Sequence, residues 1–122
     1  MLDHCAKPPI ASGDITDWER GIRRLARHPN VTCKLSGLVT EASWTGWTAA
    51  DLLPCLDIAA GAFGPERLMF GSDWPVCLLA ADYVGVVAMV ARWAQRLTVA
   101  ERDCVFGGTA MSVYQLEDRD GP

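Results

Sequence analysis

The sequence lacks the features that define several classes of protein. Its 11 basic residues are outnumbered by 15 acidic ones, and the net charge of −4 offers no attractive field to a polyanion. No apolar run approaches the roughly 20 residues that are needed to span a bilayer. There is also no H-E-x-x-H pair, phosphate-binding glycine loop or nucleophilic Ser or Cys motif. We therefore expect neither a nucleic-acid partner nor a membrane partner.

Cysteine pairs of the CxxC type are absent as well. The five cysteines are odd in number and widely spaced, at Cys5, Cys33, Cys55, Cys77 and Cys104. The first ten residues, MLDHCAKPPI, carry neither the basic nor the apolar segment of a secretory signal. We therefore expect reduced, mostly buried thiols in a cytoplasmic protein.

What the sequence does contain is typical of one globular domain. Half of its 122 residues are hydrophobic and 21% are charged, a balance that favours a folded core over disorder. Apolar residues recur at helical spacing in residues 14–28, 49–63 and 82–97. A capping box at Thr98–Glu101 predicts a fourth helix, which we expect to break at Gly107–Gly108 before a short helix at 111–116. The predicted domain covers residues 1–116, and residues 117–122 form a charged tail.

Two strands are predicted between these helices. Residues 30–37 alternate between apolar and polar side chains, and residues 67–71 form a short apolar run. Alternating strands and helices indicate an α/β fold with a parallel sheet. Parallel strands are covered on both faces, and so short a sheet leaves two open edges. The segment 38–48, which carries Trp44 and Trp47, is expected to be a loop.

Polar side chains follow the apolar segments at two points. His4 comes just after Leu2, and Asp73 follows the predicted strand 67–71. In α/β barrels the carboxyl ends of the strands carry the active site. A carboxylate there accepts a proton from an attacking water, and an imidazole binds a metal or polarises a carbonyl. The alternatives are a turn or helix cap for Asp73 and a structural role for His4.

Three further residues are candidates for substrate binding. Lys34 and Ser36 share one face at the end of the middle strand. A cation at this position holds a substrate carboxylate, although a lysine that merely reaches solvent is the alternative. Trp74 either stacks on a ring-shaped substrate or packs within a loop over the site.

Four stretches, taken together, resemble a known family. They are LDHCAKPPI, NVTCKLSGLVTEASW, FGPERLMFGSDWPVCLLA and ERDCVFGGTAMSVYQL, and within them PERLMFGSDWPV is the most specific. Their order and spacing resemble the C-terminal portion of the amidohydrolase-related family, which includes sugar lactonases and 2-pyrone-4,6-dicarboxylate lactonases. The similarity extends from Leu2 to about Leu116.

The resemblance implies a fold and a reaction. The chain would supply the last three βα units of a TIM (β/α)₈ barrel together with its C-terminal helices. Asp73 would activate the hydrolytic water, and His4 would polarise the carbonyl of a small lactone, directly or through a metal. One divalent metal such as zinc, held by His4 and Asp73, is compatible with the family, and so is catalysis without a metal. The implied reaction is ring-opening hydrolysis of a sugar-derived or carboxylated lactone.

The sequence departs from the family in several ways. Relatives usually begin with a His-x-His pair, whereas the two histidines here are His4 and His28, and Thr109 stands where relatives commonly have asparagine. A TIM barrel needs about 250 residues. We therefore expect a truncated barrel that is inactive alone. The alternatives are a non-catalytic product or a half-barrel that associates with itself or with a complementing chain; a metal-dependent decarboxylase ranks below them.

Overall fold

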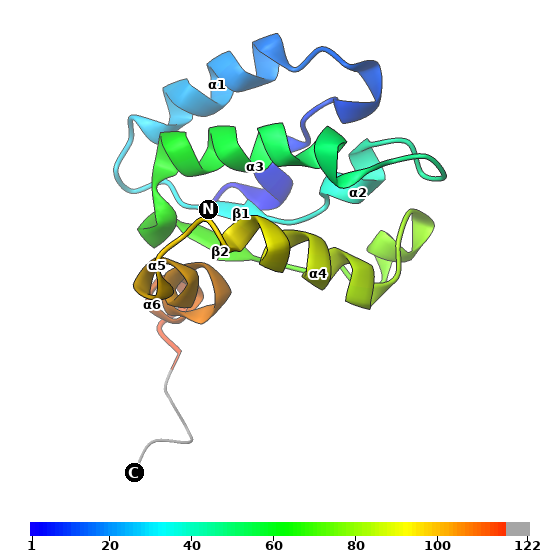
Figure 1. The fold of residues 1–122 in the computed structure, drawn as a ribbon. Coiled ribbons are helices and arrows are strands. Elements are labelled where there is room, and N and C mark those ends of the chain that lie inside the picture. The colour runs from blue at the N-terminus through cyan, green and yellow to red at the C-terminus, as the bar shows by residue number, and fades with distance from the viewer. Residues whose placement is uncertain (117–122) are drawn as a thin grey trace.

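Three parallel chain segments lie next to one another at the centre of the molecule (Figure 1). In this computed structural model, which describes residues 1–116, strand β1 (Cys33–Leu35) pairs in parallel with strand β2 (Leu68–Phe70). Leu2 forms a single parallel bridge with Cys33 on the other side of β1. The predicted parallel arrangement is therefore confirmed, although each strand is shorter than expected. The predicted charged tail, 117–122, lies outside the described residues.

The predicted strand 30–37 is reduced to three residues, and the backbone that follows it accounts for its C-terminal end. Gly37 adopts a φ of +67°, a conformation that ends extended pairing and that suits a residue without a Cβ. Within β1, Cys33 and Leu35 are buried while Lys34 is partly exposed, so the predicted alternation is correct. In β2, Leu68 and Met69 are both buried, as expected for a strand covered on both faces.

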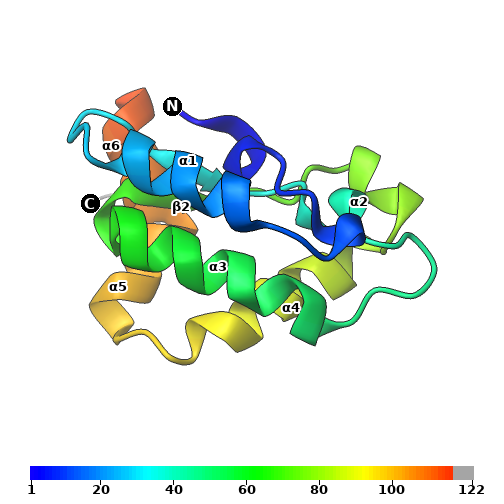
Figure 2. The same cartoon turned by 90° about the horizontal axis from the view of Figure 1, so that it is seen from above.

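The helices cover the strands in layers. The longest are α1 (Thr16–Ala26), α3 (Ala49–Phe63) and α4 (Tyr83–Ala94), and the shorter ones are α2 (Leu38–Glu41), α5 (Val99–Asp103) and α6 (Thr109–Tyr114). Helices α1 and α3 lie side by side in both views (Figure 1 and Figure 2). Among residues 1–116, no helix is long and apolar enough to cross a membrane.

Two expectations about the chain path are wrong. Part of the predicted loop 38–48 forms the short helix α2. The expected break at Gly107–Gly108 does not occur, because a π-helical turn, η5 (Cys104–Gly108), joins α5 directly to α6. Gly108 has helical dihedral angles, and the turn packs against β2, where the rings of Phe70 and Phe106 are 5.5 Å apart. This packing offsets the roughly 1 kcal/mol that a glycine costs within a helix.

The core lies between the strands and the three long helices. Its fully buried members include Ile22, Leu35, Leu52, Leu56, Leu68 and Trp93. All five cysteines are free thiols, and four of them are buried, with only Cys104 partly exposed. The expectation of mostly buried, unpaired thiols agrees with this arrangement. The same packing fixes the carboxyl ends of the strands, where the candidate site lies.

Candidate active site

His4 is positioned by an unusual turn that follows the Leu2 bridge. In η1 (Asp3–Ala6) and the residue after it, His4, Cys5, Ala6 and Lys7 have φ values of 49°, 52°, 55° and 53°. Left-handed backbone is unfavourable for L-residues, so other groups must hold it in place. The indole of Trp18 donates a 2.7 Å hydrogen bond to the carbonyl of Cys5. Helix α1 therefore anchors the turn that presents the histidine.

Asp73 reaches the site from the end of β2. The chain leaves the strand through Gly71, and Asp73 also has a positive φ, 57°, which aspartate tolerates better than most residues. Its carbonyl accepts a 2.8 Å hydrogen bond from the backbone N–H of Cys77. The Asp73 side chain is only 15% exposed. The carboxylate is therefore held in a partly enclosed position and is not a free loop residue.

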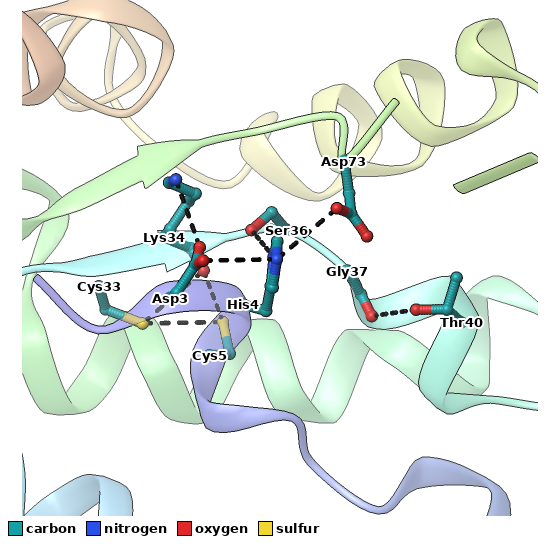
Figure 3. A network of polar contacts seen from close by, with 9 residues as sticks. All are labelled: Asp3, His4, Cys5, Cys33, Lys34, Ser36, Gly37, Thr40 and Asp73. Carbon is teal, nitrogen blue, oxygen red and sulfur yellow. Dashed lines mark hydrogen bonds and ion pairs between the residues drawn. The ribbon is translucent and has the colours of Figure 1, made fainter. Parts of the chain in front are cut away.

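The structure brings His4 and Asp73 together. The His4 Nε2 atom lies 3.6 Å from an Asp73 carboxylate oxygen, although the two residues are far apart in the sequence (Figure 3). The other ring nitrogen, Nδ1, is 2.7 Å from the hydroxyl of Ser36. Ser36 lies just beyond the end of β1 and is 3% exposed. Its side chain therefore faces the imidazole from the protein interior.

Lys34 occupies the neighbouring position on the same face and pairs with Asp3. Its Nζ atom is 3.3 Å from one Asp3 oxygen, and the other Asp3 oxygen is 3.5 Å from His4 Nε2 (Figure 3). Partial burial acts to raise the pKa of Asp3, but the hydrogen bond and charge of Lys34 together with His4 outweigh it. The pKa of Asp3 is therefore held below its ordinary value of 3.8. Asp3, Lys34, His4 and Asp73 form a continuous chain of charged and polar groups.

A polar hollow of about 220 Å³ opens beside this chain of groups. It is lined by His4, Lys7, Gly37, Thr40, Glu41, Asp73 and Val76. Neither Ser36 nor Lys34 is part of its wall, and Trp74 is not either. Trp74 projects outward with 63% of its surface exposed. Of the five candidate residues from the sequence, the structure thus brings four together around the imidazole and leaves the fifth at the periphery.

A divalent metal would find two suitable donors here. Ligand atoms on a tetrahedral zinc ion are ~3.3 Å apart, given bond lengths of about 2.0–2.1 Å. The separation of 3.6 Å between His4 Nε2 and Asp73 Oδ1 fits this spacing, and nitrogen and oxygen donors both suit zinc. A catalytic zinc usually has three protein ligands. Residues 1–116 hold no group of three that could bind a metal, so His4 and Asp73 fit as a part of a metal site.

Several residues of this site were not predicted from the sequence. Thr40 and Glu41 line the hollow from α2, within a segment that the sequence predicts to be a loop. Gly37 is predicted only to form a turn, yet a Cβ there would lie 3.0 Å from His4 Cγ, so the ring rests against its backbone. A glycine directly after a strand end is a usable signal for such close contact. No pattern in the sequence marks Thr40 or Glu41.

Known proteins resemble this chain over almost its whole length. L-fucono-1,5-lactonase of Burkholderia multivorans is 54% identical over 97% of the chain, and that of Burkholderia ambifaria is 42% identical over 99%. The chain spans 43% of the length of each. A crystal structure of a Burkholderia multivorans amidohydrolase with bound zinc superposes with a TM-score of 0.90 at 54% identity, covering 95% of this chain and 43% of that one. The profile of the amidohydrolase family matches residues 1–116, and the chain belongs to this family.

Proposed function

We propose that the chain is the C-terminal part of a lactone hydrolase, in which Asp73 and His4 act together at the lactone carbonyl, Asp73 on the attacking water and His4 on the carbonyl oxygen. The 3.6 Å separation of His4 Nε2 and Asp73 Oδ1 at a polar hollow carries this proposal. The similarity to two proteins named L-fucono-1,5-lactonase favours a sugar-derived lactone as the substrate. We also infer that Leu2, β1 and β2 belong to the last three strands of a (β/α)₈ barrel.

In the proposed reaction Asp73 is the general base. Its carboxylate takes a proton from water as the water oxygen bonds to the lactone carbonyl carbon. His4 donates a hydrogen bond to the carbonyl oxygen, which becomes negatively charged, and stabilises the tetrahedral intermediate. The bond between carbon and ring oxygen then breaks, and the proton on Asp73 passes to that oxygen. The product is the open-chain hydroxy acid.

Lys34, Ser36 and Trp74 enter the proposal in secondary roles. Lys34 is paired with Asp3 at 3.3 Å, and it would hold the carboxylate of a carboxylated lactone by exchanging Asp3 for that carboxylate. Trp74 is exposed next to Asp73 and offers a flat surface to a sugar ring. Ser36 acts through His4, as argued below. A divalent ion held by His4 and Asp73 would add Lewis-acid polarisation of the carbonyl.

A chimera tests the proposal directly. Residues 1–116 replace the matching segment of the Burkholderia multivorans lactonase, to which the chain is 54% identical. We expect the chimera to hydrolyse L-fucono-1,5-lactone, and we expect Asp73→Asn within it to lower kcat by about 10²–10⁴-fold. Asp17→Asn, which makes the same change at a 97% exposed carboxylate that does not line the hollow, serves as the matched control. A folded chimera whose turnover is unchanged by the Asp73→Asn substitution would refute the general-base role.

One observation favours a second function, that of a half-barrel that needs a partner. Six large apolar side chains within residues 74–84 are at least half exposed, namely Trp74, Val76, Leu78, Leu79, Tyr83 and Val84. Isolated apolar residues are common on surfaces, but such a concentration marks an interaction surface. Light scattering of the chain alone, and after co-expression with the remaining segment of the Burkholderia multivorans lactonase, separates self-association from complementation. A chain that stays monomeric and does not bind the remaining segment of the lactonase would contradict this second function.

A further inference from the structure

The two nitrogens of the His4 ring have contrasting neighbours. Nδ1 is 2.7 Å from the Ser36 hydroxyl. Nε2 lies 3.5 Å from an oxygen of Asp3 and 3.6 Å from an oxygen of Asp73. One nitrogen thus faces a group that both donates and accepts, and the other faces two carboxylates that, when ionised, only accept. The neutral ring carries a single N–H, so its position is decided by these neighbours.

The Ser36 hydroxyl has one hydrogen-bond partner within residues 1–116, and that partner is His4 Nδ1. Ser36 is almost fully buried. If Nδ1 carried the proton, it would donate to the Ser36 oxygen and the hydroxyl proton would have no acceptor. A buried donor without an acceptor is unfavourable. The hydroxyl is satisfied when it donates to an unprotonated Nδ1.

The carboxylates on the other side lead to the same assignment. With the proton on Nε2, the N–H points toward the oxygens of Asp3 and Asp73 and is attracted by both charges. With the proton on Nδ1, the Nε2 lone pair would face those two oxygens and be repelled. The ring occupies the space that a side chain at position 37 would fill, since a Cβ on Gly37 would stand 3.0 Å from His4 Cγ.

We propose that Ser36 is a positioning residue that holds His4 in the tautomer with its proton on Nε2. His4 then presents a hydrogen-bond donor on the side that faces Asp73 and the hollow. The catalytic consequence of this assignment rests on the proposed function. An Nε2–H group on the side of Asp73 can donate to a substrate carbonyl oxygen, whereas an Nδ1–H group faces Ser36 and cannot.

Nitrogen NMR of the ring reads the tautomer without any turnover. The chain has two histidines, His4 and the exposed His28, so a His28→Gln variant assigns both rings. Spectra are recorded as a pH series, and the tautomer is read from the neutral ring. We expect His4 Nδ1 at the downfield position of an unprotonated nitrogen and Nε2 at the upfield position of a protonated one, with His28 nearer the average of an unconstrained ring.

Variants test whether Ser36 is the cause. Ser36→Ala is expected to move the His4 Nδ1 and Nε2 shifts toward each other, while Ser36→Thr, which keeps the hydroxyl, restores the separation. Ser72→Ala is the matched control, because its hydroxyl also follows a strand end but accepts from the Trp74 N–H and not from His4. Wild-type protein with the proton on Nδ1 would overturn the proposal, whatever the variants do. So would a folded Ser36→Ala protein with unchanged shifts.

These outcomes are independent of the lactonase proposal. A chimera that fails to open a lactone leaves the ring shifts as they are, so the proposed function alone would fail. If the His4 proton lies on Nδ1 and the chimera still hydrolyses the lactone, the role of Ser36 is refuted and Asp73 remains the proposed base.

Discussion

The guanidinium of Arg67 donates a 3.0 Å hydrogen bond to the carbonyl of Ala26, the last residue of α1. The same side chain donates to the carbonyls of His28 and Phe63, each at 3.0 Å. Arg67 therefore ties the C-terminal ends of α1 and α3 to the start of β2. Carbonyls at helix ends lack partners within the helix, and a planar five-donor group satisfies several of them at once.

Replacing Arg67 with lysine is expected to destabilise the fold. Lysine keeps the charge but cannot reach three separate carbonyls, and each hydrogen bond to a charged group contributes about 1.5–3 kcal/mol. We expect Arg67→Lys to lower the free energy of unfolding by at least about 2 kcal/mol, measured by urea denaturation. Arg23→Lys, which alters an exposed pair with Glu19, is the control and should cost less than about 0.5 kcal/mol. Equal losses in the two variants would contradict the role of Arg67.

Thr109 is expected to matter for a related reason. Its hydroxyl donates to the Glu66 carbonyl at 3.0 Å, which joins α6 to the turn before β2. Thr109→Val keeps the shape but removes the donor, and should cost about 1–2 kcal/mol in the same denaturation experiment. Thr109→Asn, which introduces the residue common in relatives, retains a donor and should cost less. A valine variant as stable as wild type would show that the hydroxyl contributes nothing.

Lys34 is expected to control the acidity of Asp3. Because its hydrogen bond and charge help to hold the pKa of Asp3 below 3.8, Lys34→Met should raise that pKa toward or above this value. A folded-state pKa below the unfolded one stabilises the protein above pH 3.8, and this contribution is lost as the pH falls through the folded value. Carboxyl carbon NMR titration measures the shift. Asp14, whose pKa is lowered by the backbone N–H of Thr16, is the internal control and should not change.

Because Cys55 is a buried thiol, we expect the free energy of unfolding to fall at alkaline pH. Burial raises the pKa of Cys55 from 9.0 to about 11. In this case the folded pKa lies above the unfolded one, so the unfolded chain releases its proton first. Stability is therefore complete below pH 9 and falls between pH 9 and about 11, by up to roughly 1.4 kcal/mol per pH unit for one thiol. Urea denaturation across this range should show a shallower fall for Cys55→Ala. An identical slope would contradict the assignment.

Much of the fold could be predicted because local patterns agreed with packing. The helix expected at 49–63 is α3, Ala49–Phe63, because its apolar stripe is long and its ends are marked by Thr48 and Gly64. The strand at 30–37 was predicted from the alternation of Val31, Cys33 and Leu35, and the parallel arrangement was predicted because strands and helices alternate along the chain. Helix α2 could not be predicted, since four residues are too few to display a period. The π turn at Gly107 depends on contact with β2, which no local pattern encodes.

Part of the candidate site could be predicted from the sequence, whereas its arrangement and the lining residues Thr40 and Glu41 could not. His4 and Asp73 were candidates because they follow apolar segments, and parallel strands bring such positions to one edge. Lys34 and Ser36 were candidates because they share one face of the middle strand. The sequence could not show that Lys34 pairs with Asp3, or that Ser36 lies behind the histidine. Those contacts depend on the left-handed turn at His4, and this turn contains no glycine that would have indicated a left-handed backbone in the sequence.

The left-handed turn positions His4 through contacts that lie outside the hollow where its imidazole acts. Four consecutive residues without glycine wind in the hand that L-amino acids disfavour, at a cost of roughly 1–2 kcal/mol each. The indole of Trp18, which lines no part of the hollow, is one of the groups that keep this backbone from relaxing. Helix α1 thus helps to set the position of the imidazole, so a substitution at Trp18 can disturb the site although this residue does not line the hollow.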